Sequence, residues 1–243
     1  MMKLKKDSRM PPRLSRNPSF NYQYDHAVDL TQDLANNMPV YPGDPVPTFH
    51  RTATIAANGV NLSQLDLGSH TGTHVDAPRH FVEMGTTLDR IPVSDFIGEA
   101  VVLDLSFKPE GSGITALDLK KTLALVDYRH GDAILCYTGC SAKWGDPKVN
   151  SNFTYLTPRG AEYIVSKKAR AFGIDFLSVE KFHSKTHATH KELLSHGIYI
   201  VESLNRKLGD FAGERILFIA LPIKFKDGDG APCRALAVPI KVA

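Results

Sequence analysis

The sequence is broken into short apolar runs by glycine, proline and charged residues, and this spacing limits the folds that the chain can adopt. Compact runs of this kind predict buried strands. We expect strands at 28–31, 52–55, 60–67, 99–105, 131–137, 172–176, 197–201, 215–221 and 234–242. Only three helical segments are clear, including those at 115–125 and 158–168. The pattern predicts one α/β domain, weighted towards strands, in which helices and strands are interspersed.

The composition agrees with a folded domain and limits the classes of partner that this domain can bind. The 243 residues are 42% hydrophobic and 23% charged, with a formal net charge of +3, ordinary values for a globular protein. Residues 1–16 carry six basic side chains and one acidic side chain, a net +5, which leaves a net −2 for the rest. A nearly neutral body gives no basis for binding a phosphate backbone, so we expect no nucleic-acid partner. We expect residues 1–20 to be a basic, disordered tail and residues 21–243 to form the domain.

Cysteine usage and hydropathy indicate the compartment. No stretch approaches the roughly 18 apolar residues that a membrane helix needs, and the first residues lack the apolar segment of a secretory signal. The three cysteines, Cys136, Cys140 and Cys233, are an odd number in a chain too large to need disulfides, which favours reduced thiols. We therefore expect a cytoplasmic protein with no membrane partner. The basic, acid-poor tail leaves organelle targeting as an alternative.

Histidines are concentrated in one short segment that has an unusual backbone. His70, His74 and His80 fall within eleven residues together with Asp76. Gly72 and the flanking threonines disfavour a helix there, so we expect a tight turn followed by an extended stretch. Residues two apart on an extended chain point to the same side, which puts His74 beside Asp76, and the turn can bring His70 back to them. Two imidazoles and a carboxylate suit a divalent transition metal and leave a position open for water.

The role of His80 stays open on spacing alone. It follows Asp76 by four residues, after Pro78. It is either a further metal ligand or a free imidazole available for proton transfer.

The segment His70-Thr-Gly-Thr-His-Val-Asp-Ala-Pro-Arg-His80 resembles the signature of the metal-dependent cyclase superfamily, His-x-Gly-Thr-His-x-Asp-x-Pro-x-His. That superfamily includes bacterial kynurenine formamidases and isatin hydrolases. Further similar segments occur in the same order: 41–44, 131–145, 190–202 and 229–235. The resemblance thus runs from about residue 25 to the end, and it implies a swivelling β/β/α fold.

The resemblance also implies a set of metal ligands. His70, His74 and Asp76 correspond to the ligands of a first metal, and Asp76 also to the bridge to a second. His190 and Glu202 correspond to the residues that complete the pair. A carboxylate at 202 supports two ions, because single-metal members similar to isatin hydrolase carry glutamine there. We expect two Zn²⁺ per chain, with Mn²⁺ as the alternative.

The implied activity is hydrolysis of a small amide by metal-activated water. His80 corresponds to the family's proton donor and acceptor, and Tyr41 to the pocket aromatic residue, which is tryptophan in typical formamidases. The best single substrate is an aryl formamide such as N-formylkynurenine. The alternatives are a cyclic amide or lactone hydrolase and a non-catalytic, metal-stabilised binding protein. The family also implies a homodimer or homotetramer.

The other conspicuous residues receive structural interpretations. We expect His183 and His187 to lie in a loop or lid, and His196 to pack or hydrogen-bond where a strand begins. Trp144 either lines the pocket or packs. Isolated histidines are expected to be structural or solvent-exposed: His26, His50 and His130.

Overall fold

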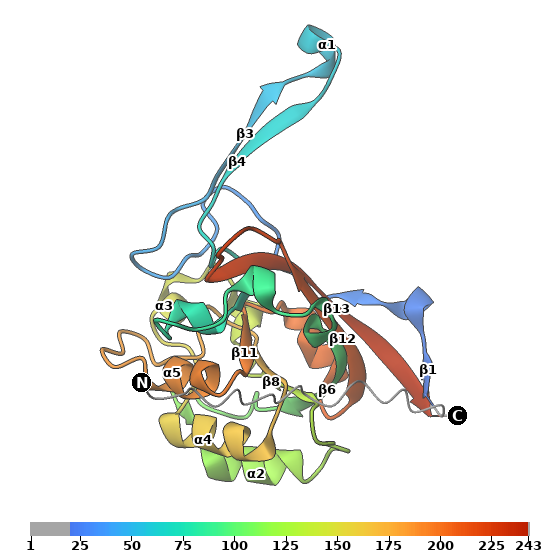
Figure 1. Cartoon of the computed structure of the whole chain (residues 1–243), viewed down its shortest axis with the longest axis vertical. Coiled ribbons are helices and arrows are strands. Elements are labelled where there is room, and N and C mark those ends of the chain that lie inside the picture. Colours follow the sequence, from blue (N-terminus) through green and yellow to red (C-terminus); the bar gives the residue numbers. More distant parts are fainter. Residues whose placement is uncertain (1–19, 243) are drawn as a thin grey trace, which may run out of the picture.

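A long strand near the C-terminus organises the fold, because it pairs with strands at both ends of one sheet (Figure 1). The computed structural model describes residues 20–242. The tail that the sequence predicts to be disordered lies outside these residues, apart from Phe20, which begins β1.

The strands are β1 (Phe20–Tyr22), β2 (Val28–Asp29), β3 (Thr48–Ala53), β4 (Leu62–Asp66), β5 (His74–Asp76), β6 (Ile97–Asp104), β7 (Gly113–Ile114), β8 (Ala133–Tyr137), β9 (Tyr155–Leu156), β10 (Ala171–Ile174), β11 (Tyr199–Glu202), β12 (Arg215–Pro222) and β13 (Gly230–Val242). The α-helices are α1 (Ile55–Asn58), α2 (Ala116–Leu123), α3 (Pro147–Asn150), α4 (Pro158–Lys167) and α5 (Ala188–Ser195).

The main sheet closes on itself as a barrel. It runs in the order β1-β13-β12-β6-β8-β10-β11-β5, with β2 added on β13, and an extra pairing of β13 with β5 closes the ring from β13 to β5. The strands β6, β8, β10 and β11 are parallel, whereas β5, β12 and β13 join antiparallel. The prediction of a single strand-rich α/β domain is therefore confirmed.

Alternation along the strands divides the apolar side chains into two cores. One core gathers the residues that face the barrel interior, such as Val75, Val102 and Leu135. Their neighbours Val101 and Ile134 point the other way, into a second core shared with α2, α4 and α5. Because successive strand residues face opposite sides, each parallel strand is buried on both faces and needs an apolar run. The helices α2 and α4 lie side by side over this outer face (Figure 1).

Most predicted elements agree with the structure. The helices predicted at 115–125 and 158–168 are α2 and α4, each capped by a threonine side chain, Thr115 and Thr157. The strand predicted at 52–55 is wrong at its end, because Ile55 begins α1. Thr54 accepts a hydrogen bond there from the backbone N–H of Ala57 and starts a helical turn instead, a typical N-cap.

One hairpin projects far from the barrel (Figure 1). This arm consists of β3, α1 and β4. The strands β3 and β4 pair with each other in a separate two-stranded sheet. The arm exposes Ile55, Leu62 and Leu65, each more than half accessible.

Across residues 20–242, no helix has the length and apolar character needed to cross a bilayer.

Candidate active site

The predicted ligands meet on the outer face of the barrel, where β5 lies between β11 and β13. Glu202 of β11 is opposite His74, and Gly230 of β13 is opposite Asp76. His74 and Asp76 share one face of β5, while Val75 between them enters the barrel core. The strand therefore presents both ligands of the predicted extended segment to the same side.

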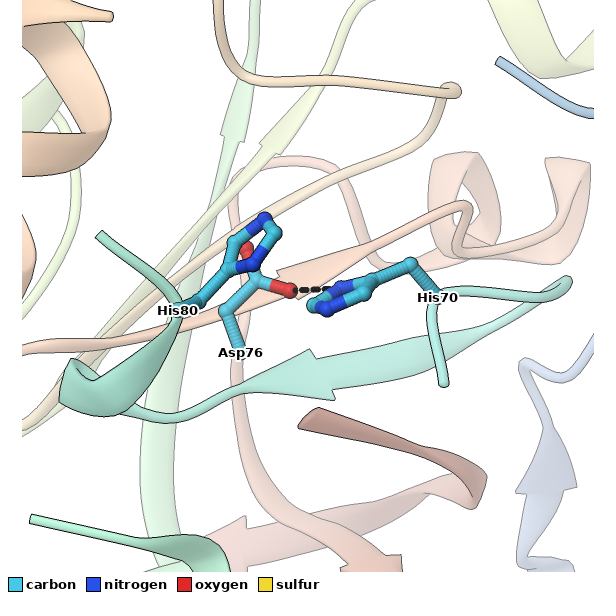
Figure 2. Close-up of side chains that lie close together, drawn as sticks. All are labelled: His70, Asp76 and His80. Atoms are coloured by element: carbon cyan, nitrogen blue, oxygen red, sulfur yellow. Dashed lines mark hydrogen bonds and ion pairs between the residues drawn. The ribbon is translucent and has the colours of Figure 1, made fainter. Parts of the chain in front are cut away.

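The turn before β5 returns His70 to this face. Gly72 has a φ of +64°, a left-handed conformation that glycine adopts without steric cost. His70 Nδ1 then lies 2.8 Å from Asp76 Oδ1 (Figure 2). A Cβ at position 72 would also lie 2.9 Å from the Leu34 side chain, so the turn is closely packed as well as left-handed.

Two carboxylates divide their oxygens between two groups of histidines. Asp76 Oδ1 is 3.2 Å from His74 Nε2, and Asp76 Oδ2 is 3.8 Å from His190 Nε2. Glu202 repeats this arrangement, with Oε2 3.4 Å from His74 Nε2 and Oε1 3.2 Å from His190 Nε2. Each carboxylate thus has one oxygen on the His70–His74 side and one on the His190 side.

These donors fit divalent cations. His74, Asp76 and Glu202 are buried, and each offers a ligand atom within 4.8 Å of the others. Two buried atoms in this cluster, His74 Nε2 and Asp76 Oδ2, make no hydrogen bond. A buried polar atom without a partner is costly, whereas an ion between imidazole and carboxylate groups would satisfy both atoms.

Without an ion, the cluster binds protons. Burial alone would lower the pKa of the imidazoles, but the carboxylates outweigh it and raise the pKa of His70 to about 9 and of His190 to about 10. Burial would likewise raise the pKa of Asp76, and the neighbouring His70 and His74 instead hold it well below its ordinary value. Since metal ligands must be deprotonated, a cation would replace these protons.

His80 lies beside the cluster, on a short 3₁₀ turn, η2 (Pro78–His80). Its ring stacks on that of His70, with centroids 3.8 Å apart. His70, Asp76 and His80 have ligand atoms within 4.8 Å of one another, so the geometry permits His80 either as a ligand or as a free imidazole.

A cavity of about 350 Å³ opens over these residues. Tyr41, Phe81 and Leu177 line it together with His80 and His190. The Tyr41 hydroxyl accepts a hydrogen bond from the backbone N–H of His183, at 3.1 Å. This contact joins two loops of the cavity wall, so the wall beside the ligand cluster is partly aromatic and tied across its loops.

Comparison with known proteins identifies the family. Residues 28–181 match the family described as "Putative cyclase". The chain belongs to this cyclase family. It is 33% identical to a kynurenine formamidase of Bacillus cereus over 88% of this chain and 97% of that protein. A kynurenine formamidase of Geobacillus thermodenitrificans is also 33% identical, over 86% of this chain and 95% of that protein.

Solved structures share the cyclase fold. A structure described as a predicted metal-dependent hydrolase from Bacillus stearothermophilus has a TM-score of 0.72 and 33% identity, covering 87% of this chain and 97% of that one. An isatin hydrolase bound to thioisatinate has a TM-score of 0.82 at 23% identity, covering 92% and 94% of the two chains. The expected cyclase-like fold is therefore confirmed.

The remaining histidines of this cyclase-family chain have varied positions. His187 lines the cavity and stacks on Phe81 with centroids 4.9 Å apart, while His183 lies in the preceding loop. His196 ends α5, where its Nδ1 is 2.8 Å from the carbonyl oxygen of Glu192. The isolated histidines are exposed, as expected: His26, His50 and His130.

Trp144 and the cysteines are structural. Trp144 packs against Phe176 in a small aromatic core and is not among the residues that line the cavity. Of its two alternatives, packing is the observed one. Cys136, Cys140 and Cys233 are all free and buried, as the sequence predicts.

Glu180 orients His190, and no local sequence pattern indicates this role. Glu180 Oε2 accepts from the backbone N–H groups of Thr189 and His190, at 3.1 and 3.2 Å, and lies 3.2 Å from His190 Nδ1. It thereby caps the start of α5 and directs His190 Nε2 towards Glu202. Burial would raise the Glu180 pKa, but the charge and hydrogen bonds of His190 together with other hydrogen bonds outweigh burial and lower that pKa. Such outer carboxylates commonly fix metal-binding imidazoles, but ten residues separate this pair.

Proposed function

We propose that this protein is a metal-dependent hydrolase that cleaves an aryl formamide, with N-formylkynurenine as the best single substrate. The observation that carries the proposal is the pair Asp76 and Glu202, each with one oxygen towards His74 and one towards His190. The similarity to kynurenine formamidases over most of the chain supports the choice of substrate.

Two divalent ions per chain, Zn²⁺ or alternatively Mn²⁺, suit these donors. His70, His74 and His190 would hold the ions together with the two carboxylates. When bound, such ions lower the pKa of water from near 16 to about 7 and polarise a carbonyl oxygen. The assignment is supported by His74 Nε2 and Asp76 Oδ2, two buried atoms that make no hydrogen bond.

The protein's own residues would position the substrate and transfer protons. Tyr41 and Phe81 give the cavity an aromatic wall suited to an aryl ring. His80 would accept a proton from the attacking water and donate one to the nitrogen of the departing arylamine. Its Nδ1 faces Asp229 at 3.7 Å, which leaves Nε2 for this transfer. The products would be formate and an arylamine.

A substrate panel tests the activity. Metal-reconstituted protein would be assayed with N-formylkynurenine, isatin and simple lactones, and the formamide should give the highest kcat/KM. Faster hydrolysis of isatin or a lactone would favour the cyclic-substrate alternative. Full metal occupancy without hydrolysis of any of them would leave only a binding protein.

Glu202→Gln tests the number of ions. The substitution keeps the size of the side chain and removes the charge needed to bridge two cations. Elemental analysis should show fewer ions per chain than in the unmodified protein, with a large loss of activity. An unchanged metal count with surviving activity would contradict the two-ion assignment.

We also propose that the protein is a cytoplasmic homodimer or homotetramer whose subunits meet through the arm. A two-stranded hairpin is marginally stable alone in water, yet the arm leaves Ile55, Leu62 and Leu65 exposed. Its two ends continue into the cavity wall, at 39–44 and at His70. A second copy covering the arm would therefore also support the cavity. The buried, free cysteines are consistent with a reducing compartment.

A further inference from the structure

Asp229 lies outside the proposed ligand set and yet contacts two of its histidines. Its Oδ2 is 2.9 Å from His70 Nε2 and 3.7 Å from His80 Nδ1. The Ser69 hydroxyl is 3.3 Å from the same oxygen. One carboxylate oxygen thus faces the outer nitrogen of an expected metal ligand and one nitrogen of the stacked imidazole beside it.

The backbone holds Asp229 firmly in this position. Its carbonyl oxygen accepts from the N–H of Ala77 at 2.9 Å, and the carbonyl oxygen of Gly228 accepts from the N–H of Leu88 at 2.8 Å. The next residue, Gly230, pairs with Asp76 at the start of β13. Two separate segments and a strand pairing therefore fix the loop that carries the carboxylate.

Asp229 affects the two histidines differently, because a different ring nitrogen faces it in each. His70 Nδ1 faces Asp76, so His70 Nε2–H is free to donate to Asp229. His80 has only Nδ1 directed at this carboxylate. A carboxylate beside Nδ1 favours the tautomer that carries its proton there, and leaves Nε2 unprotonated and able to accept a proton. Aspartate side chains ordinarily have a pKa of about 4, so Asp229 is a carboxylate near neutral pH.

We propose that Asp229 is a positioning residue that fixes the Nδ1–H tautomer and the ring orientation of His80, so that His80 Nε2 faces the cavity for proton transfer. The inference rests on the proposed function, in which His80 transfers the proton. Asp229 would thus orient His80 in addition to its contact with His70.

Asp229→Asn is the sharpest variant, because it keeps the shape of the side chain. Its amide NH₂ can donate to Nδ1 and so favours the wrong tautomer. The matched control is Asp227→Asn, the same change two residues away, at a side chain whose nearest ion pair is with Arg90 at 3.9 Å. Asp227 has a φ of +58°, which asparagine also tolerates.

Two substrates separate positioning from structural damage. Proton donation matters most when the departing amine is basic, so 4-methoxyformanilide depends on His80 more than 4-nitroformanilide does. In zinc-loaded Asp229→Asn, kcat for the methoxy substrate should fall about tenfold to a hundredfold, the usual effect of losing an outer-shell partner. The nitro substrate should lose much less, KM and zinc content should hardly change, and Asp227→Asn should behave like the unmodified protein.

A second readout is independent of turnover. Nitrogen-15 NMR of the zinc-loaded protein should show the His80 Nδ1–H tautomer, and this preference should be lost in Asp229→Asn. Equal losses for both substrates, or a His80 tautomer that does not change, would overturn the proposal. If the unmodified protein hydrolyses neither formanilide, the proposed function fails, and the NMR result alone decides the role of Asp229.

Discussion

Stacked imidazoles in the site have different surroundings, and these suggest different tasks. His70 lies between Asp76 and Asp229, with a carboxylate oxygen within 2.9 Å of each ring nitrogen. His80 forms one ion pair, with Asp229 at 3.7 Å, and its ring is partly exposed. A residue enclosed by acids suits cation binding, whereas one with a free nitrogen at a cavity suits proton transfer.

Removing the His80 imidazole should separate these tasks. We expect His80→Ala to keep its metal and to lose roughly a hundredfold or more in kcat, the usual scale for a lost acid–base group. Elemental analysis and steady-state kinetics would measure both quantities, with the exposed His130→Ala as control. Loss of the metal in His80→Ala would instead make His80 a ligand.

The raised histidine pKa values predict how the metal-free protein responds to pH. His70 and His190 have folded pKa values of about 9 and 10, above the ordinary value of about 6.5. Protonation therefore favours the folded state; this contribution is complete below about pH 6.5 and is lost as the pH rises through 9 to 10. The Tm of chelator-treated protein should fall between pH 7 and 10. Titrating zinc at pH 8 should release protons, and absence of release would contradict these shifts.

At the scale of elements, β5 is a very short strand that depends on both neighbours. Its three residues pair with β11 on one side and with β13 on the other. Gly230 permits the second pairing, because a Cβ there would lie 2.6 Å from His70 Cε1 and 2.8 Å from the carbonyl oxygen of Val75. Gly230 therefore packs tightly against both β5 and the expected metal ligand His70.

Gly230→Ala should damage the metal site by displacing this contact. Overpacking of this kind costs about 1–3 kcal/mol, and the His70 ring or β13 must move. We expect a lower Tm and weaker zinc affinity, measured by thermal unfolding and by competition with a chelator. Unchanged affinity would mean that His70 is not held by this contact.

Sequence patterns predict most of the helices and strands, but they do not predict the side-chain contacts of the site. The strands of the barrel and the helices α2 and α4 follow from apolar runs and caps. The helix α5, which carries His190, is short and polar on its exposed side, and its position was not predicted. No local pattern predicts the contacts of Glu180 or Asp229, and 159 residues separate His70 from Asp229. Motif spacing predicts groups within a loop, but pairings between strands decide which side chains meet.

In the molecule as a whole, the strands of the arm take no part in the barrel sheet. Replacing Leu62 and Leu65 with lysine should leave a folded barrel and shift the protein towards monomers, because charged side chains oppose burial of this surface. Light scattering would measure the mass, with Leu117→Lys on the exposed face of α2 as control. An unchanged mass would exclude the arm as the contact between subunits.

Closure of the barrel between β5 and β13 also has a kinetic consequence. The strands that meet there come from distant parts of the sequence, and chains dominated by such non-local pairings fold slowly. The metal ligands from β5, α5 and β11 come together only when β5 pairs with β11. A partly folded chain therefore has no complete site, and zinc should slow global unfolding rather than speed the early steps of folding.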